Sequence, residues 1–181
     1  AVFQENGFLV SQELQTRIQA QGYPHVSTDS GQYLRVHYPQ NPSASRLQEI
    51  GNLWQSLENA ILAEDDRDPI TGKTWMELID LDSWVKKYLI EELFGNIDAC
   101  FISQFFYYDA QKLYAGPVWD YGQSMGLESA WQLAAGQVLH ADRYQVNASH
   151  TTPWFHALYQ KAIFRERMLE IWVLILYNGI K

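Results

Sequence analysis

Two aspartates of the chain are spaced so that a folded β-hairpin would bring them to one place. Asp98 follows a predicted helix that stops at Gly95–Asn96, and Asp120 follows the second strand of the predicted hairpin. Because a hairpin returns the chain to where it began, the two carboxylates are expected to face one cleft. Of two such carboxylates, one can orient or accept the proton of a hydroxyl while the other holds a divalent cation. The spacing therefore predicts chemistry on a hydroxyl beside a bound cation.

Each aspartate also has an ordinary structural explanation. An Asp after a helix stop is often a turn residue, and an Asp after a strand often caps the next helix. The combination is more informative, because helix, aspartate, hairpin and second aspartate follow one another in the order of a protein-kinase active centre. In that order a side chain a few residues after the first aspartate completes the metal shell, and Ser103 and Gln104 are the candidates here.

The elements that must position these residues are predicted from apolar spacing. Five short β-prone runs are expected to be strands: Gly7–Val10, Tyr23–Thr28, Gln32–Tyr38, Ser103–Tyr108 and Lys112–Trp119. Apolar residues at steps of three and four predict helices that begin near Ser43 or Ser45 and near Asp80 or Asp82. Further helices are expected at Glu128–Leu139, Pro153–Ala162 and Phe164–Tyr177. Strands, helices, hairpin and helices in this order indicate an α+β fold.

Composition narrows the class of protein. With 181 residues, 47% hydrophobic and 19% charged, the chain can bury a sizeable core, and its net charge of −8 argues against binding a nucleic-acid backbone. The longest apolar run, Ile171–Tyr177, is far shorter than the ~20 residues of a membrane span. The single cysteine, Cys100, excludes an internal disulfide framework. Because the chain starts without Met and ends after an apolar run, we expect it to be a fragment of a longer protein.

Aromatic residues are unusually frequent, at 14% with seven Trp and 11 Tyr. Such side chains supply large buried areas, so most of them are expected in the core. The positions that fall on the inner faces of predicted elements are Trp84, Leu89, Leu93, Phe106 and Trp172.

The stretch from Trp75 to Gly126 resembles the CotH (spore coat protein H) kinase family. The resemblance is carried by several short segments: Gly72–Trp75, Ile79–Trp84, Tyr88–Leu93, Gly95–Ala99, Lys112–Tyr121 and Ser124–Gly126. Weaker similarity extends over Tyr33–Pro39, Trp154–Phe155 and Phe164–Arg165. The resemblance implies a single protein-kinase-like domain over residues 1–181. In it, the remnant of a small β-rich lobe (1–42) packs on a mainly helical part (43–181) with the catalytic loop and hairpin.

The resemblance also implies an activity: ATP and Mg²⁺ as cofactors, and transfer of the γ-phosphoryl group to Ser or Thr of a Ser-rich coat or surface protein. Asp98 would be the catalytic carboxylate, and Asp120 would bind the metal with Gln104. The residues implied at the nucleotide are His37, Tyr38 and Arg35. An extracytoplasmic or cell-surface location is expected on the same ground.

Two positions depart from the family pattern. Relatives commonly have a lysine where this chain has His37, and many have a second acid where it has Gly122. An imidazole with an ordinary pKa of ~6.5 carries less than a full charge near neutrality, which weakens a phosphate clamp. Arg35, two residues away on the same strand face, is the alternative clamp. Glu49 and Glu58 are candidates for the acid that pairs with the kinase lysine, but without that lysine both are expected to face solvent.

Two other functions stay open at this point. The same departures suit a kinase-like interaction module that has lost its catalytic activity. This hypothesis would be excluded if the protein transferred phosphate and Asp98→Ala abolished the transfer. Paired acids and abundant Trp would also suit a carbohydrate-active protein with two carboxyls ~5–10 Å apart across an aromatic groove. A glycan array without binding would count against that reading.

Overall fold

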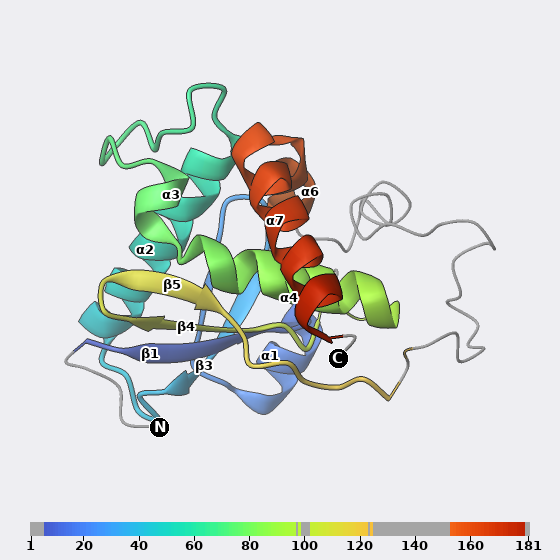
Figure 1. Cartoon of the computed structure of the whole chain (residues 1–181). Helices are drawn as coiled ribbons and strands as arrows, with labels where there is room; N and C mark the ends of the chain where they lie inside the picture. The colour runs from blue at the N-terminus through green and yellow to red at the C-terminus, as the bar shows by residue number, and fades with distance from the viewer. Residues whose placement is uncertain (1–5, 97, 99–101, 123, 125–152, 180–181) are drawn as a thin grey trace.

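The computed structural model describes residues 6–96, 98, 102–122, 124 and 153–179. Its sheet is antiparallel throughout, with strand order β2-β3-β1-β4-β5. The strands are β1 (Phe8–Gln12), β2 (His25–Ser27), β3 (Tyr33–Tyr38), β4 (Phe105–Asp109) and β5 (Lys112–Ala115). The helices are α1 (Gln15–Gln21), α2 (Ala44–Leu62), α3 (Trp75–Leu78), α4 (Leu81–Phe94), α6 (Pro153–Gln160) and α7 (Ala162–Gly179). Figure 1 shows α3, α4, α6 and α7 above the sheet and α1 below it.

The predicted α+β class is confirmed, and the sheet crosses the predicted boundary between residues 1–42 and 43–181. Strand β1 pairs with β3 on one side and with the hairpin strand β4 on the other. The first strands and the hairpin therefore form one continuous sheet, which fixes the hairpin relative to the front of the chain.

The starts of the two long helices α2 and α4 were predicted correctly from their capping residues. Ser43 caps α2 by accepting a hydrogen bond from the backbone N–H of Arg46, and Asp80 caps α4 by accepting one from Ser83. Gly95 ends α4 in the left-handed conformation that glycine adopts without strain. The predicted helix 128–139 lies outside the described residues.

One strand was predicted too long, and two short helices were missed. The strand expected over Lys112–Trp119 ends at Ala115, since Pro117 has no N–H to donate to a ladder. Helix α1 was missed because it buries a single apolar residue, Ile18, and so has no helical periodicity. Helix α3 was missed because it is one turn long, although Thr74 and Glu77 form a complete capping box at its start.

The core is an aromatic cluster between the sheet and the helices. Trp54 of α2 lies 4.8 Å from Trp154 and 5.1 Å from Phe106 between ring centroids, and Trp84 lies 5.1 Å from Phe106. The expected burial of Trp84 and Phe106 is confirmed. Leu93 was wrongly predicted as core: its exposed fraction is 62%, because α4 turns it away from the sheet.

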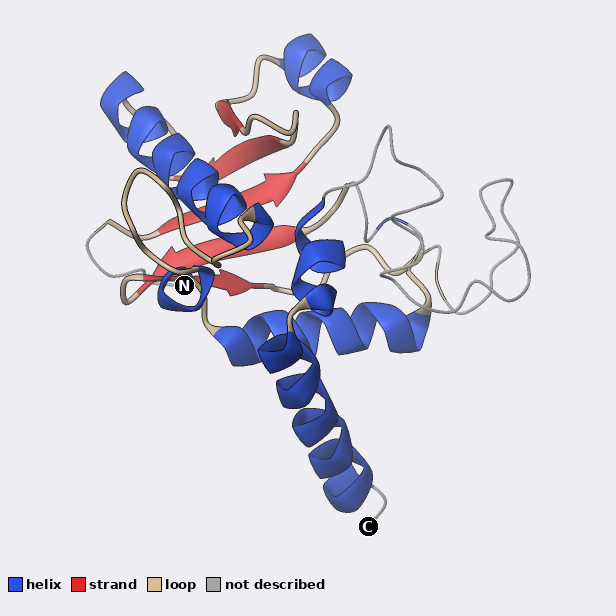
Figure 2. Cartoon of the chain, turned by 90° about the horizontal axis from the view of Figure 1, so that it is seen from above, coloured by secondary structure: helices blue, strands red, loops and turns tan. Residues whose placement is uncertain are grey.

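The remaining core predictions fall at the edge of the packed interior. Leu89 and Trp172 are half-buried and line a surface cleft between α4 and α7. Figure 2 shows that α7 extends away from the rest of the described fold, and its last turns expose Val173, Leu174 and Tyr177. In the part of the chain that the structure describes, no helix is long and apolar enough to cross a membrane.

Glu58 does not face solvent, contrary to expectation. Its carboxylate accepts hydrogen bonds from the Thr28 hydroxyl at 2.8 Å, from the Ser30 N–H at 3.0 Å and from the Trp154 indole at 2.8 Å. The buried Glu58 thus holds the β2–β3 turn and α6 together, whereas Glu49 is exposed as expected.

Asp68 stabilises the loop between α2 and α3. It is buried, and its carboxylate accepts hydrogen bonds from Ser56 at 2.7 Å, Asn59 at 3.0 Å and the Thr71 hydroxyl at 2.6 Å. Burial alone would raise the pKa of Asp68, but these hydrogen bonds outweigh it and hold the pKa well below its usual range. The folded loop therefore favours the charged carboxylate.

We expect Asp68→Asn to lower the free energy of unfolding by about 2–3 kcal/mol at pH 7, since an amide accepts fewer of these bonds. The contribution should be fully present above the unfolded-state pKa of ~3.9 and be lost as pH falls below it towards the lowered folded-state pKa. Urea titrations of wild type and variant at pH 7 and pH 3 measure this difference. The matched control is Asp65→Asn at an exposed position of the same loop; an equal loss in both variants would contradict the prediction.

Candidate active site

The hairpin that carries the site is closed by a tight turn. Ala110 and Gln111 both have positive φ angles, 47° and 63°, which is the backbone geometry of a two-residue type I′ turn. At its other end the hairpin is tied to β1: the Gln12 N–H donates to the Gln104 carbonyl at 2.8 Å, and the Ser103 N–H donates to the Gln12 carbonyl at 3.1 Å. Ser103 and Gln104, which directly precede β4, are thereby anchored to the sheet.

Asp98 is buried beside this anchor, with an exposed fraction of 9%. Its N–H donates to the Asn96 side-chain oxygen at 3.2 Å, and its carbonyl accepts from the Ile102 N–H at 3.1 Å. Burial first, and the charge of Asp120 second, raise the pKa of the Asp98 carboxyl, while Arg17 opposes them. The charge of Asp120 thus disfavours the charged form of Asp98. That the two carboxylates face one cleft stays a prediction.

Asp120 is exposed and has a strained backbone. Its φ angle is +61°, and that of Ser103 is +57°. A non-glycine residue in this region costs of order 1 kcal/mol or more, and such residues concentrate at functional sites. The Ser103 hydroxyl donates a hydrogen bond to the Asp120 carboxylate at 3.2 Å. Ser103, the alternative to Gln104 in the sequence-based prediction, is thus the residue that contacts Asp120.

Aromatic contacts connect Trp119, the residue before Asp120, with His37, one of the predicted nucleotide residues. Trp119 has an exposed fraction of 59% and lies 5.9 Å from Phe105, which in turn lies 5.1 Å from the His37 imidazole. Nε2 of His37 is hydrogen-bonded to the Ser11 hydroxyl at 2.8 Å. Burial first, and Arg35 second, lower the pKa of His37, so the imidazole is neutral at pH 7.

The other two predicted nucleotide residues lie on the same strand. The Arg35 guanidinium stacks on the Tyr23 ring at 3.5 Å from its centroid, while Tyr38 is exposed. Because a stacked guanidinium is already engaged, Arg35 is poorly placed to replace the lysine missing at position 37.

The ion pair between Glu13 and Arg17 was not predicted, because the helix that carries Arg17 was missed. The two side chains lie 3.1 Å apart. The Arg17 charge partly offsets the rise in the pKa of Asp98. The Glu13 charge in turn partly offsets the lowering of the His37 pKa. Helix α1 thus carries a cation, Arg17, whose charge favours the charged form of Asp98.

Comparison with known proteins identifies the family of the chain. A family model described as CotH kinase protein matches residues 12–179 of the chain. The chain belongs to the CotH kinase family. No curated protein and no solved structure matched it.

The CotH match covers Asp98, Asp120 and Gln104, and the three differ in their access to a cation. Gln104 is fully buried, and neither atom of its side-chain amide has a hydrogen-bond partner among the described residues. An orphaned buried amide and two coupled carboxylates are oxygen donors of the kind that Mg²⁺ prefers. In the described part of the chain no three His, Cys, Asp or Glu residues gather into a metal-binding group. A cation held by Asp98 and Asp120 would therefore have to take the rest of its shell from a bound phosphate or water.

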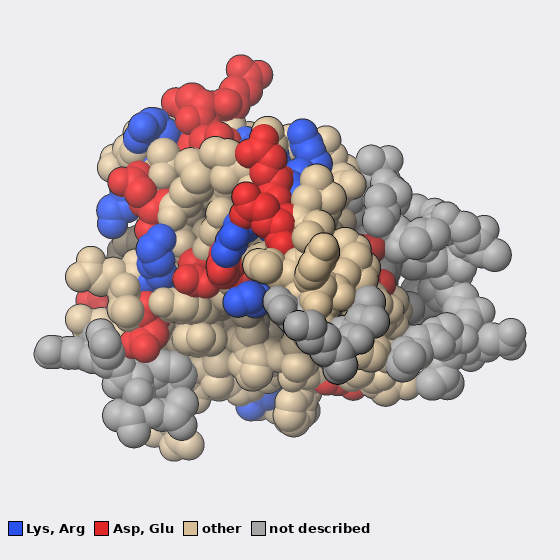
Figure 3. All heavy atoms as spheres, viewed as in Figure 1, with Lys and Arg blue, Asp and Glu red and all other residues tan. Residues whose placement is uncertain are grey.

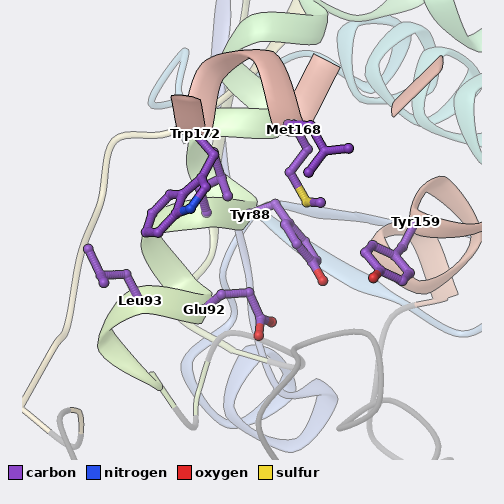
Figure 4. Close-up of a pocket in the computed structure, with 8 residues that line it drawn as sticks. Tyr88, Glu92, Leu93, Tyr159, Met168 and Trp172 are labelled. Atoms are coloured by element: carbon purple, nitrogen blue, oxygen red, sulfur yellow. The ribbon is translucent and has the colours of Figure 1, made fainter. Parts of the chain in front are cut away.

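A separate apolar cleft lies away from these residues. It has a volume of about 260 Å³ and is lined by Leu89, Leu169 and the residues labelled in Figure 4. Figure 4 shows Met168 and Trp172 of α7 facing Tyr88 of α4 and Tyr159 of α6. No predicted site residue lines this cleft. On the face drawn in Figure 3, the basic side chains are interspersed with acidic ones and form no continuous patch among the described residues.

Proposed function

We propose that this CotH domain has a protein-kinase-like fold and transfers the γ-phosphoryl group of ATP to a Ser or Thr hydroxyl of a protein. The observation that carries the proposal is the order helix, Asp98, hairpin, Asp120, which is the chain order of a kinase centre. The match to the CotH kinase family supports it. The acceptor is proposed to be a Ser-rich coat or surface protein.

The roles of the residues follow from their surroundings. The raised pKa of Asp98 makes its carboxylate a stronger base, suited to orient or accept the proton of an acceptor hydroxyl. Asp120, exposed and fixed by Ser103, would hold the magnesium ion, which when bound neutralises phosphate charge. Arg17 supplies a positive charge close to Asp98, where the transferred group would lie.

Isothermal titration with ATP, with and without Mg²⁺, tests the nucleotide part of the proposal. We expect magnesium-dependent binding by the wild type and none by Asp120→Ala. Asp29→Ala, at an exposed position of the β2–β3 turn, is the matched control and should bind as the wild type does. If titration of the wild type with ATP and Mg²⁺ gave no heat, the proposal that ATP is the phosphate donor would be wrong.

We expect His37→Lys to tighten MgATP binding by about tenfold, because it replaces a neutral imidazole with a full positive charge beside the phosphates. His25→Lys adds the same charge on the neighbouring strand β2 and should leave the dissociation constant unchanged. Titration of the two variants in parallel measures the difference. Equal tightening in both would show a general charge effect, not a phosphate contact at position 37.

A second candidate function is an interaction module without transfer activity. The neutral His37, held by Ser11 and Phe105, favours it, because the phosphate clamp of a kinase is then absent. Incubation with γ-labelled ATP and a Ser-rich peptide separates the candidates. If the wild type incorporated label into the peptide and Asp98→Ala did not, the interaction-module hypothesis would be excluded.

A further inference from the structure

The second half of α7 has no polar face. Residues Ile171–Tyr177 are all apolar, and most of them have exposed fractions between 44% and 80%: Val173, Leu174, Ile175, Leu176 and Tyr177. Figure 2 shows this end of α7 extending away from the rest of the described fold. A helix that is hydrophobic on all sides is normally buried, and a large exposed apolar patch marks an interaction site. The second half of α7 is therefore a contact surface.

Four residues of this helix share one face, which we call the α7 stripe: Leu169, Trp172, Val173 and Leu176. Residues at positions i, i+3, i+4 and i+7 lie on one side of a helix, and here that side points away from the buried Ile171. Leu169 and Trp172 also line the cleft between α4 and α7, together with the exposed Leu93. The stripe and the cleft thus form one apolar surface.

The cleft suits protruding side chains better than a small ligand. Its volume of about 260 Å³ lies below the ~300–1,000 Å³ of typical small-molecule sites. Figure 4 shows the carboxylate of Glu92, the charged residue of the lining, directed away from Trp172. Large apolar side chains, like those at the exposed end of α7, match such a cleft in size and polarity.

The charge of this surface points to a second copy of the chain as its occupant. Residues 171–179 carry no charged side chain, and Glu170 is already paired with Arg167 at 2.7 Å. A basic or acidic partner would find no opposite charge along the stripe. Two copies that each carry a net charge of −8 repel one another, and they approach most easily through a surface without carboxylates.

The spacing of the stripe is also self-complementary. Its four positions are symmetric about the midpoint between Trp172 and Val173. When two such helices cross antiparallel, Leu169 faces Leu176 of the partner subunit and Trp172 faces Val173 of the partner subunit. This is the isologous contact of a two-fold dimer, in which the same patch serves both copies.

The area available is sufficient for a dimer. Crossing at the stripe would cover the four stripe residues, Leu93 and Tyr177. At roughly 100 Å² for each large apolar side chain, the two copies together would bury about 1,200 Å², the lower end of specific interfaces.

We propose that the chain forms a symmetric dimer in which two α7 helices cross antiparallel at the α7 stripe, with the end of each helix at the α4–α7 cleft of the other copy. The inference goes beyond the proposed function and does not depend on it, because no predicted site residue belongs to the stripe or lines the cleft.

Sedimentation equilibrium of the full chain between about 1 and 100 µM tests the dimer. We expect the wild type to dimerise with a dissociation constant in the micromolar range. Leu176→Glu should raise that constant about 100-fold, since symmetry places two carboxylates in the apolar contact. The matched control is Leu174→Glu, the same substitution at an exposed residue outside the stripe, which should dimerise as the wild type does. Thermal melting is recorded for each variant.

A second pair of variants leaves the stripe uncharged. In a Cys100→Ser background, Val173→Cys lies next to the two-fold axis and should form a disulfide-linked dimer on mild oxidation, whereas Leu174→Cys should not. Equal cross-linking of the two would overturn the antiparallel crossing, and equal weakening by both glutamates would show non-specific apolar association instead. A wild type that stays monomeric at 100 µM would overturn the dimer. If that monomer floated with phosphatidylcholine vesicles, the surface would be a lipid contact.

Discussion

Asp98→Asn is expected to lower the rate of phosphoryl transfer about 10³-fold, within the range that a general base contributes. Asparagine has nearly the same shape, so the backbone hydrogen bonds of residue 98 with Asn96 and Ile102 should persist. Removing one of two like charges in a partly desolvated site also removes repulsion, because Asp120 and burial both disfavour the charged form of Asp98. The melting temperature should therefore be unchanged or higher while activity is lost.

Single-turnover transfer from γ-labelled ATP to a Ser-rich peptide measures the rate, and thermal melting measures stability. MgATP affinity should stay within a factor of a few of the wild type, because the cation is assigned to Asp120. Asp109→Asn, at the hairpin end remote from Asp98, is the control. A variant at position 98 that transfers phosphate at the wild-type rate would leave Asp98 as a turn residue and nothing more.

The parts of the site that could be predicted from sequence are those built by local signals. The helix stop at Gly95 and the hairpin that lies between Asp98 and Asp120 were both predicted, because a hairpin joins residues that are close in sequence. The caps at Ser43 and Asp80 are local in the same sense. Each of these features depends on a few neighbouring residues.

The parts that could not be predicted depend on distant partners. Glu58 is buried because the Trp154 indole, 96 residues further along the chain, donates to its carboxylate. Arg17 reaches the site from a helix that has too few apolar residues to show a period. Leu93 follows the apolar pattern of α4 but is exposed. Apolar spacing shows which residues share a helix face, but not which of them other elements cover.

The core that supports the hairpin centres on Trp54. Its side chain is fully buried among Trp84, Phe106 and Trp154, and Phe106 lies on the hairpin strand β4. A cavity at this position would therefore weaken the packing beneath the sheet as well as the attachment of α2 and α6. The indole N–H of Trp54 has no hydrogen-bond partner among the described residues, so packing alone accounts for its contribution.

Trp54→Ala is expected to lower the free energy of unfolding by about 3–5 kcal/mol, the cost of deleting a buried tryptophan in a close-packed core. For a domain of this size each kcal/mol corresponds to a shift of about 2–4 °C, so the melting temperature should fall by roughly 6–20 °C. Trp54→Phe should cost much less, because it keeps most of the ring and removes a buried donor that has no acceptor. Trp119→Ala, at an exposed position, is the control and should melt close to the wild type. If Trp54→Ala melted no lower than Trp119→Ala, the aromatic cluster would not be the core that fixes the hairpin.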